Sequence, residues 1–258
     1  MNIQLLPSTF DQTGCATPEQ RLTCFLLDDR VAVDAGSIAL ALTDAQRRDV
    51  RDVILTHPHM DHMATLPIYI DAMFASLREP VRVHATAEVI ELLQRDVFNW
   101  TVYPRFSDLS NEFGPVMEYV PFRVGEEFSV AHLRVVAVPV NHIVPTVGLL
   151  VTGERATVAF SSDTAATEDF WHLVNRAPRV DALMVEASFP DSMAELATVS
   201  GHLTPRSLAA ELDKFAHANA DVLVVHLKPS YRNILLDELA ALKRPRLSVM
   251  EPGRTYVW

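Results

Sequence analysis

The chain has few cysteines and no long apolar stretch. Only Cys15 and Cys24 occur among 258 residues, and their spacing matches no metal-binding or redox motif, so we expect ordinary packed thiols. No uninterrupted apolar segment approaches the roughly 20 residues that a membrane-spanning helix needs. The N-terminus, MNIQLLPSTFDQTG, lacks the basic region that begins a signal peptide. These absences predict a cytoplasmic protein without a membrane partner.

The sequence also lacks internal repeats, low-complexity tracts and Gly/Ser-rich linkers. Nothing therefore marks a domain boundary, and we expect one domain over residues 1–258. Basic side chains are scarce: 22 stand against 33 acidic ones, for a formal net charge of −11. Such a surface repels nucleic-acid phosphates unless a local basic patch overrides it. A nucleic-acid partner is disfavoured for this reason.

Short runs of Val, Ile and Leu alternate with segments of helical period, which is typical of a layered α/β protein. The runs predict strands at Cys24–Leu27, Val31–Val33, Val53–Leu55, Val81–His84, Leu133–Val138, Thr157–Phe160, Ala182–Val185 and Val222–Val225. The helical periods predict helices at Pro67–Leu77, Ala87–Gln94, Thr167–Ala177, Pro205–His217 and Tyr231–Leu242. Thr204 is a suitable N-cap for the fourth helix, and Pro205 fits its first turn.

Residues 96–118 interrupt this alternation, because aromatic side chains are spread there among Pro, Asn and Asp. Two interpretations stay open. The segment is either an irregular packed connection, or an active-site lid or insertion whose aromatic and amide groups help to form a substrate pocket.

The stretch THPHMDHM (residues 56–63) places three histidines and an aspartate within six positions, directly after an apolar run. Crowded imidazoles repel one another when protonated, and they add little to a core. Neutral imidazole and carboxylate are good ligands for zinc-like cations. Because the short spacing has little packing rationale, it predicts a metal site.

Three further strands are followed by a His or Asp, and in open α/β architectures ligands bind at that edge of the sheet. If these side chains converge, one ion is held by His57, His59 and His142. A second is held by Asp61, His62 and His226, and Asp163 bridges the two ions. Zinc is our first expectation for both metals, and manganese or iron would also suit these ligands.

The motif HxHxDH, a distant His, a bridging Asp and a final His together resemble the metal-binding signature of the metallo-β-lactamase superfamily. The resemblance covers nearly the whole chain. It implies an αββα sandwich with a dinuclear centre at one edge of the two sheets. Because position 163 is Asp and not Cys, the sequence is similar to the hydrolytic phosphoesterase and glyoxalase branches.

Three segments narrow the resemblance: MVEASFPD (184–191), SGHLTPRSLAAEL (200–212) and VVHLKPSY (224–231). They are similar to segments of class II cyclic-nucleotide phosphodiesterases, as is VFNWTVYPRF (97–106), where Tyr103 replaces the expected Trp. The small residues usual after HxHxDH are also altered, to Met63-Ala64-Thr65. The resemblance implies a small phosphodiester substrate, cyclic AMP first, and a homodimer. Phe98, Asn99 and Phe106 are expected to contact the base or ribose.

His202 could merely cap or pack, but the resemblance implies a place beside the phosphate without binding metal. It would then stabilise the developing charge or protonate the leaving oxygen, and Glu186 would orient it and raise its pKa. Two ions would lower the pKa of a bridging water, giving hydroxide at neutral pH. Asp61 would orient this nucleophile and accept its proton, and a 5′-nucleotide would be released.

Other functions remain open. A tRNA 3′-processing endonuclease would share the dinuclear site, but the acidic balance disfavours it, as does Met184 where a His would be expected. A thiolester hydrolase resembling glyoxalase II would keep the metal ligands and need neither Glu186 nor His202. A non-catalytic metal-dependent binding protein is a further class, which the complete ligand set disfavours.

Overall fold

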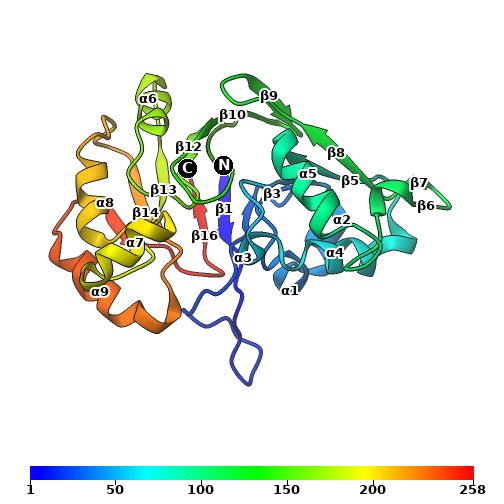
Figure 1. Cartoon of the computed structure of the whole chain (residues 1–258), viewed down its shortest axis with the longest axis horizontal. Coiled ribbons are helices and arrows are strands. Elements are labelled where there is room, and N and C mark those ends of the chain that lie inside the picture. The colour runs from blue at the N-terminus through cyan, green and yellow to red at the C-terminus, as the bar shows by residue number, and fades with distance from the viewer.

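Two seven-stranded sheets form the centre of the protein, and the computed structural model describes all residues, 1–258 (Figure 1). The first sheet has the order β16 (Thr255–Val257), β1 (Asn2–Leu5), β2 (Phe25–Leu27), β3 (Val31–Val33), β4 (Asp52–Ile54), β5 (Val81–Ala85) and β8 (Met117–Pro121). The second has the order β15 (Leu247–Val249), β14 (Asp221–Val225), β13 (Ala182–Glu186), β12 (Thr157–Phe160), β11 (Val147–Thr152), β10 (Leu133–Pro139) and β9 (Glu127–Val130).

The helices cover the outer faces of both sheets, so the layers follow the order helix, sheet, sheet, helix (Figure 1). Beside the first sheet lie α1 (Ile38–Ala41), α2 (Asp44–Asp49), α4 (Leu66–Met73) and α5 (Ala87–Asp96). Beside the second lie α6 (Asp169–Arg176), α7 (Ala194–Ser200), α8 (Pro205–Leu212) and α9 (Arg232–Ala241). This is the predicted αββα sandwich.

Three apolar cores hold these layers together. The central core contains residues of both sheets, and the rings of Phe25 and Phe160 meet across it with centroids 5.1 Å apart. The other two cores join each sheet to its own helices. Every residue of β2, β3 and β4 is buried, which explains why these strands, apart from Asp52 at the start of β4, are continuous apolar runs without alternation.

The predicted strands and helices are all present, with ends that differ by a few residues. Thr204 caps α8 as expected: its hydroxyl accepts a hydrogen bond from the backbone N–H of Ser207 at 3.3 Å. The helix ends at Leu212, however, well before the expected His217. Sequence reasoning missed the edge strands β8, β9, β15 and β16 and the inner strands β1 and β11, together with the short helices α1, α2 and α7.

The segment 96–118 lies at the edge of the first sheet away from the HxHxDH motif. Strands β3, β4 and β5 are parallel, so their C-terminal ends share one edge, and the motif follows β4 there. Helix α5 starts at that edge and returns to the opposite one. The segment then leads to the start of β8, where the backbone of Val81 donates a hydrogen bond to Val116. This topology places the segment away from the motif and favours the packed connection over the lid.

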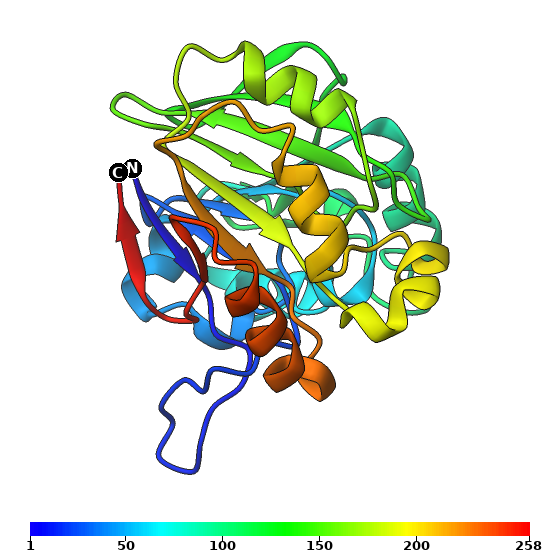
Figure 2. The ribbon, with the colours of Figure 1, turned by 90° about the vertical axis from the view of Figure 1, so that its left-hand side faces the viewer.

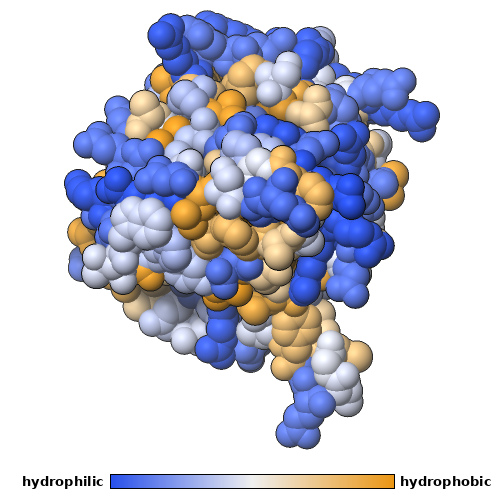
Figure 3. Space-filling model, turned by 90° about the vertical axis from the view of Figure 1, so that its right-hand side faces the viewer, coloured by the Kyte–Doolittle hydropathy of each residue, from blue (hydrophilic) through white to orange (hydrophobic).

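A loop formed by residues 7–22 projects from the body between β1 and β2 (Figures 1 and 2). Figure 3 shows the same projection at the lower edge of another face. Its tip is closed by a bridge between Phe10 and Ala16. Cys15 lies exposed on this loop, contrary to the expectation of a packed thiol, whereas Cys24 is buried in the core; both thiols are free.

The two chain ends lie side by side in the first sheet, where β1 pairs with β16 (Figure 2). The N-terminal ammonium of Met1 donates a hydrogen bond to the carbonyl of Trp258 at 2.6 Å. None of the helices combines the length and the apolar character that crossing a bilayer requires.

Candidate metal centre

The HxHxDH motif forms the turn that leaves β4. Pro58 favours an extended backbone at the residue before it, His57, whose side chain is fully buried. His59 is extended as well, and it precedes the single helical turn α3 (Met60–Met63). This change from extended chain to helix directs the side chains of one short segment into two adjacent groups.

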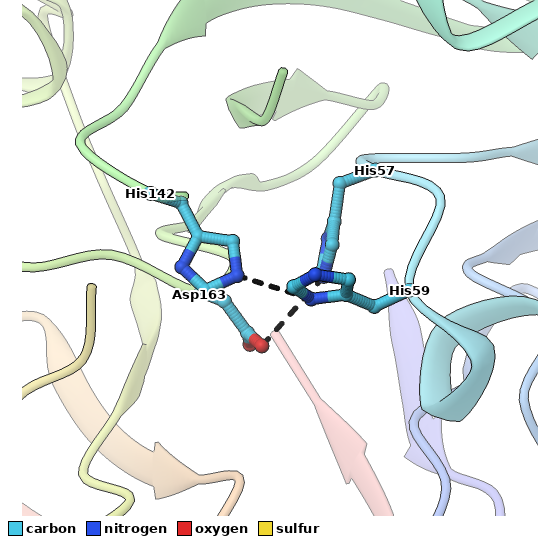
Figure 4. A group of neighbouring side chains, drawn as sticks. All are labelled: His57, His59, His142 and Asp163. Carbon is cyan, nitrogen blue, oxygen red and sulfur yellow. Dashed lines mark hydrogen bonds and ion pairs between the residues drawn. The ribbon is translucent and has the colours of Figure 1, made fainter. Parts of the chain in front are cut away.

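Residues distant in the sequence complete both groups. His142 follows β10, Asp163 follows β12 and His226 follows β14. Figure 4 shows His57, His59, His142 and Asp163 pointing toward one another from three separate segments. The first group consists of these four residues, and the second of Asp61, His62, Asp163 and His226. Within each group the ligand atoms lie within 4.8 Å of one another.

Asp163 is the residue that the two groups share. One carboxylate oxygen, Oδ2, lies 3.7 Å from Nε2 of His57 in the first group and 3.4 Å from Nε2 of His226 in the second. The other, Oδ1, lies 3.4 Å from Nε2 of His62. These distances are too long for good hydrogen bonds and leave room between the groups. They fit the predicted bridging position.

Several histidines are oriented by hydrogen bonds from Nδ1, which leave Nε2 for a ligand. The Nδ1 atom of His62 donates to Asp34 at 2.7 Å, and that of His142 donates to the carbonyl of Gly201 at 2.9 Å. The corresponding partners of His57 and His226 are the hydroxyls of Thr56 and Ser188, at 3.0 Å each. Such outer partners fix the tautomer and the ring orientation of metal-binding histidines.

Gly201 is required at its position for two reasons. Its φ of 69° is in the left-handed region, and a Cβ atom there would lie 2.9 Å from Nδ1 of His142. Ser162 and His226, with φ of 55° and 59°, are also left-handed without being glycine. Backbone strain of this kind costs of order 1–3 kcal/mol per residue and is concentrated at functional sites.

Two buried atoms test whether a metal fits. Nε2 of His57 and Nε2 of His62 have no hydrogen-bond partner, although both are shielded from water. A buried nitrogen without a partner is costly, and metal coordination would satisfy both atoms. The donor set of imidazoles and carboxylates is also one that divalent cations prefer. The residues present therefore fit a metal centre.

The protonation states agree with ligand chemistry, which needs neutral imidazole and ionised carboxylate. Burial and neighbouring histidines hold the pKa of His57 well below its usual value. Burial also lowers the pKa of His59 and of His142. Burial alone would raise the pKa of Asp163, but His226 and His62 hold it well below the usual range.

His62 is different. Burial lowers its pKa, but the carboxylates of Asp163 and Asp34 outweigh burial and raise the pKa well above its usual value. The two carboxylates therefore favour the protonated form of His62. A metal ion at Nε2 would displace that proton.

His202 lies beside the two groups and is held by Glu186. Its Nδ1 donates to Oε1 of Glu186 at 2.7 Å, and its ring centroid is 5.0 Å from that of His142 and 5.5 Å from that of His226. Glu186 is only 1% exposed, and it also accepts hydrogen bonds from the backbone of Thr164 and the hydroxyl of Ser188. Because the carboxylate is satisfied in this way, Glu186 and His202 form an orienting pair and not a third metal site.

The pKa of His202 is raised above its usual value. Burial lowers it, but the hydrogen bond and the charge of Glu186 outweigh burial, with a further contribution from Asp163. Its Nε2 remains available to a bound molecule. A protonated imidazole in this position can stabilise negative charge or donate a proton.

The three residues expected to contact a base or ribose do not take part in the site. Phe98 and Phe106 are each 1% exposed and pack against each other in the first core, with centroids 6.0 Å apart. The amide of Asn99 is used in its own turn, where Oδ1 accepts from the backbone of Thr101 and Val102. Packing and turn formation account for these residues, and the structure does not bring them into the two metal groups.

Sequence reasoning missed several residues that surround the centre. Asp34 and Ser188 orient ligands, and Phe189, Lys228 and Tyr231 lie along its rim. Asp34 offered a signal, because a carboxylate directly after a fully buried strand needs a partner. The others lie in the segments MVEASFPD and VVHLKPSY that carried the resemblance, but their individual contacts depend on how the loops after β13 and β14 meet.

Comparison with known proteins identifies the class. Residues 30–227 match the family model described as the beta-lactamase superfamily domain. This match covers more than half of the chain, which therefore belongs to that superfamily. With its two flanked sheets and its His/Asp cluster, it is a hydrolase of the metallo-β-lactamase fold.

A curated relative points to a branch of the superfamily. The chain is 24% identical over 250 residues to a probable 3′,5′-cyclic-nucleotide phosphodiesterase of Yersinia pestis, covering 81% of this chain and 70% of the relative. The predicted resemblance to this branch is confirmed at that level.

Solved structures share the fold. Unliganded yeast PDE1 has a TM-score of 0.77 at 17% identity, over 98% of both chains. YhfI of Bacillus subtilis, a metallo-β-lactamase fold protein, has a TM-score of 0.74 at 16% identity, over 99% of both chains. The short form of human tRNase Z has a TM-score of 0.68 at 15% identity, over 100% of this chain and 99% of the other. At these identities the likeness shows the fold alone.

Proposed function

We propose that the protein is a metal-dependent phosphodiesterase that hydrolyses 3′,5′-cyclic nucleotides, cyclic AMP first, to 5′-nucleotides. The observation that carries this proposal is the His202–Glu186 pair in ring contact with ligands of both metal groups. A protonated imidazole there suits an anionic substrate with an oxygen leaving group. The name of the relative from Yersinia pestis supports the choice of substrate class.

The proposal includes two divalent cations, zinc first and manganese or iron as the other metals that suit these ligands. His57, His59 and His142 would hold one, Asp61, His62 and His226 the other, and Asp163 both. When bound, such ions supply the Lewis acidity that makes water nucleophilic near neutral pH.

The roles of the side chains follow from their positions. Asp61, whose Oδ2 lies 3.1 Å from Nε2 of His226, would orient the attacking water and accept its proton. His202 would stabilise the charge that develops on the phosphoryl oxygens and protonate the departing 3′ oxygen. Glu186 would keep His202 protonated and aimed at that oxygen.

A panel of substrates tests the proposal. The purified, metal-quantified protein would be incubated with 3′,5′-cyclic AMP, bis(p-nitrophenyl) phosphate, a thiolester and a precursor tRNA, and the products separated. We expect rapid formation of 5′-AMP. Cleavage of the precursor tRNA alone, or of the thiolester alone, would contradict the proposal and favour one of the other reactions of this fold.

A further inference from the structure

The aromatic residue nearest His202 is Phe189, and the apolar packing of the protein does not explain it. Its ring is partly exposed and belongs to none of the three cores. The ring centroid is 5.7 Å from that of His202 and 6.1 Å from that of Tyr231, at interplanar angles of 62° and 45°. A partly exposed large aromatic beside an active-site side chain, outside the apolar cores, indicates a contact surface.

The backbone fixes this aromatic pair relative to the metal centre. Phe189 directly follows Ser188, whose hydroxyl orients His226. Tyr231 ends the short helical turn Pro229–Tyr231, a few residues after His226. Strands β13 and β14 are parallel neighbours, so the two loops leave the sheet side by side (Figure 2). Tyr231 packs partly against the third core, which holds its ring in place.

We propose that Phe189 and Tyr231, here called the aromatic wall, stack against the nucleobase of the substrate. The inference rests on the proposed function. Along this surface the metal ligands come first, then His202, and then the aromatic wall. A nucleotide presents its phosphate, its 3′ oxygen and its base in the same order. Lys228, in the same loop as Tyr231, has Nζ 3.9 Å from Oδ2 of Asp61 and adds a positive charge on the phosphate side.

Stacking also defines the kind of selectivity to expect. Every base has a π-face, so an aromatic platform binds different bases with similar strength. The wall therefore favours a nucleotide over a sugar phosphate and does not separate adenine from guanine. We expect 5′-AMP and 5′-GMP to bind with dissociation constants within about threefold of each other.

Calorimetric binding to the metal-loaded protein tests the aromatic wall apart from turnover. We expect the wild type to bind 5′-AMP about tenfold or more tightly than ribose 5-phosphate, as base stacking on one aromatic residue would give. Phe189→Leu should remove most of that preference and leave the affinity for ribose 5-phosphate unchanged. Phe189→Trp should restore it. Phe113→Leu, which changes an exposed aromatic on the far β6 (Ser110–Asn111)–β7 (Gly114–Pro115) hairpin, should have no effect.

Equal affinity of the wild type for 5′-AMP and ribose 5-phosphate would contradict the proposed stacking role. An equal loss of affinity for both ligands in Phe189→Leu would contradict it as well. Tyr231→Leu provides a second variant with the same expected loss of preference. Hydrolysis of cyclic AMP by the wild type is scored separately. Preferential binding of 5′-AMP without hydrolysis would support the wall and contradict the proposed function, and hydrolysis without that preference would do the reverse.

Discussion

Glu186 and His202 form a 2.7 Å hydrogen bond between two buried side chains, and the histidine ring contacts ligands of both metal groups. The carboxylate aligns the ring and raises its pKa. The site therefore has two parts, the metal ligands and a proton donor. Substitutions can remove either part without the other.

Asp163→Ala should remove metal as well as activity, because both groups lose their shared ligand. We expect fewer than two ions per chain by elemental analysis, and cyclic AMP hydrolysis reduced to background. Asp237→Ala, which removes an exposed carboxylate from α9, should keep the metal content and the hydrolytic activity of the wild type. Full metal occupancy in Asp163→Ala would refute the bridging assignment.

His202→Ala should retain metal and lose turnover. Removal of a general acid lowers rates by about 10²-fold or more. The kcat for cyclic AMP measured beside the metal content distinguishes this outcome from loss of the site. If turnover is unchanged, His202 has a packing role only.

Glu186→Gln should shift the pH dependence. Burial and Lys228 lower the pKa of His202, and the carboxylates of Glu186 and Asp163 raise it. The rings that face His202 are those of His142 and His226. Without the charge of Glu186, the pKa falls and the acid form is lost at lower pH. The alkaline limb of kcat/KM should therefore move to lower pH, and an unmoved limb would contradict the role of Glu186.

Asp52→Asn should affect stability and not the site. At the far edge of the first sheet, the Asp52 carboxylate accepts two hydrogen bonds from Arg82, both at 2.7 Å, and one from His84 at 2.9 Å. Breaking a fully buried pair costs roughly 3–5 kcal/mol. Because Arg82 reaches solvent, we expect the free energy of unfolding in urea to fall by about 2 kcal/mol, with metal content unchanged.

The sign of the pH effect on this pair is also fixed. Burial would raise the pKa of Asp52, but Arg82 and His84 hold it well below its usual value. The stabilisation is therefore present above the unfolded pKa of about 3.9 and is lost as the pH falls further. The difference in stability between wild type and Asp52→Asn should shrink below about pH 4. A constant difference would show that the charge of Asp52 is not involved.

The ligand cluster was predictable because most of its information is local. HxHxDH lies within one turn, and the other ligands each follow a buried strand whose apolar run is visible in the sequence. Once the strands share an edge, His142, Asp163 and His226 must come close to it. The pairing of Glu186 with His202 depended on the family resemblance.

Other features could not be read from the chain because they depend on tertiary geometry. The composition of residues 96–118 suits a pocket as well as a packed connection, and only the direction of α5 decides which edge the segment occupies. The family resemblance of VFNWTVYPRF placed Phe98 and Phe106 at the substrate, but both pack in the first core. The aromatic rings beside His202 are instead Phe189 and, behind it, Tyr231. The edge strands were missed because one side of each is open, which weakens the apolar pattern.

Metal-dependent cleavage of cyclic AMP tests the central claim most directly. The protein would be stripped with a chelator, titrated with Zn²⁺, Mn²⁺ or Fe²⁺, and assayed for 5′-AMP and 3′-AMP by chromatography. The account predicts an inactive metal-free protein, activity that rises until two ions are bound per chain, and 5′-AMP as the product. Full activity without metal, 3′-AMP as the product, or no cleavage by the fully loaded protein would contradict it.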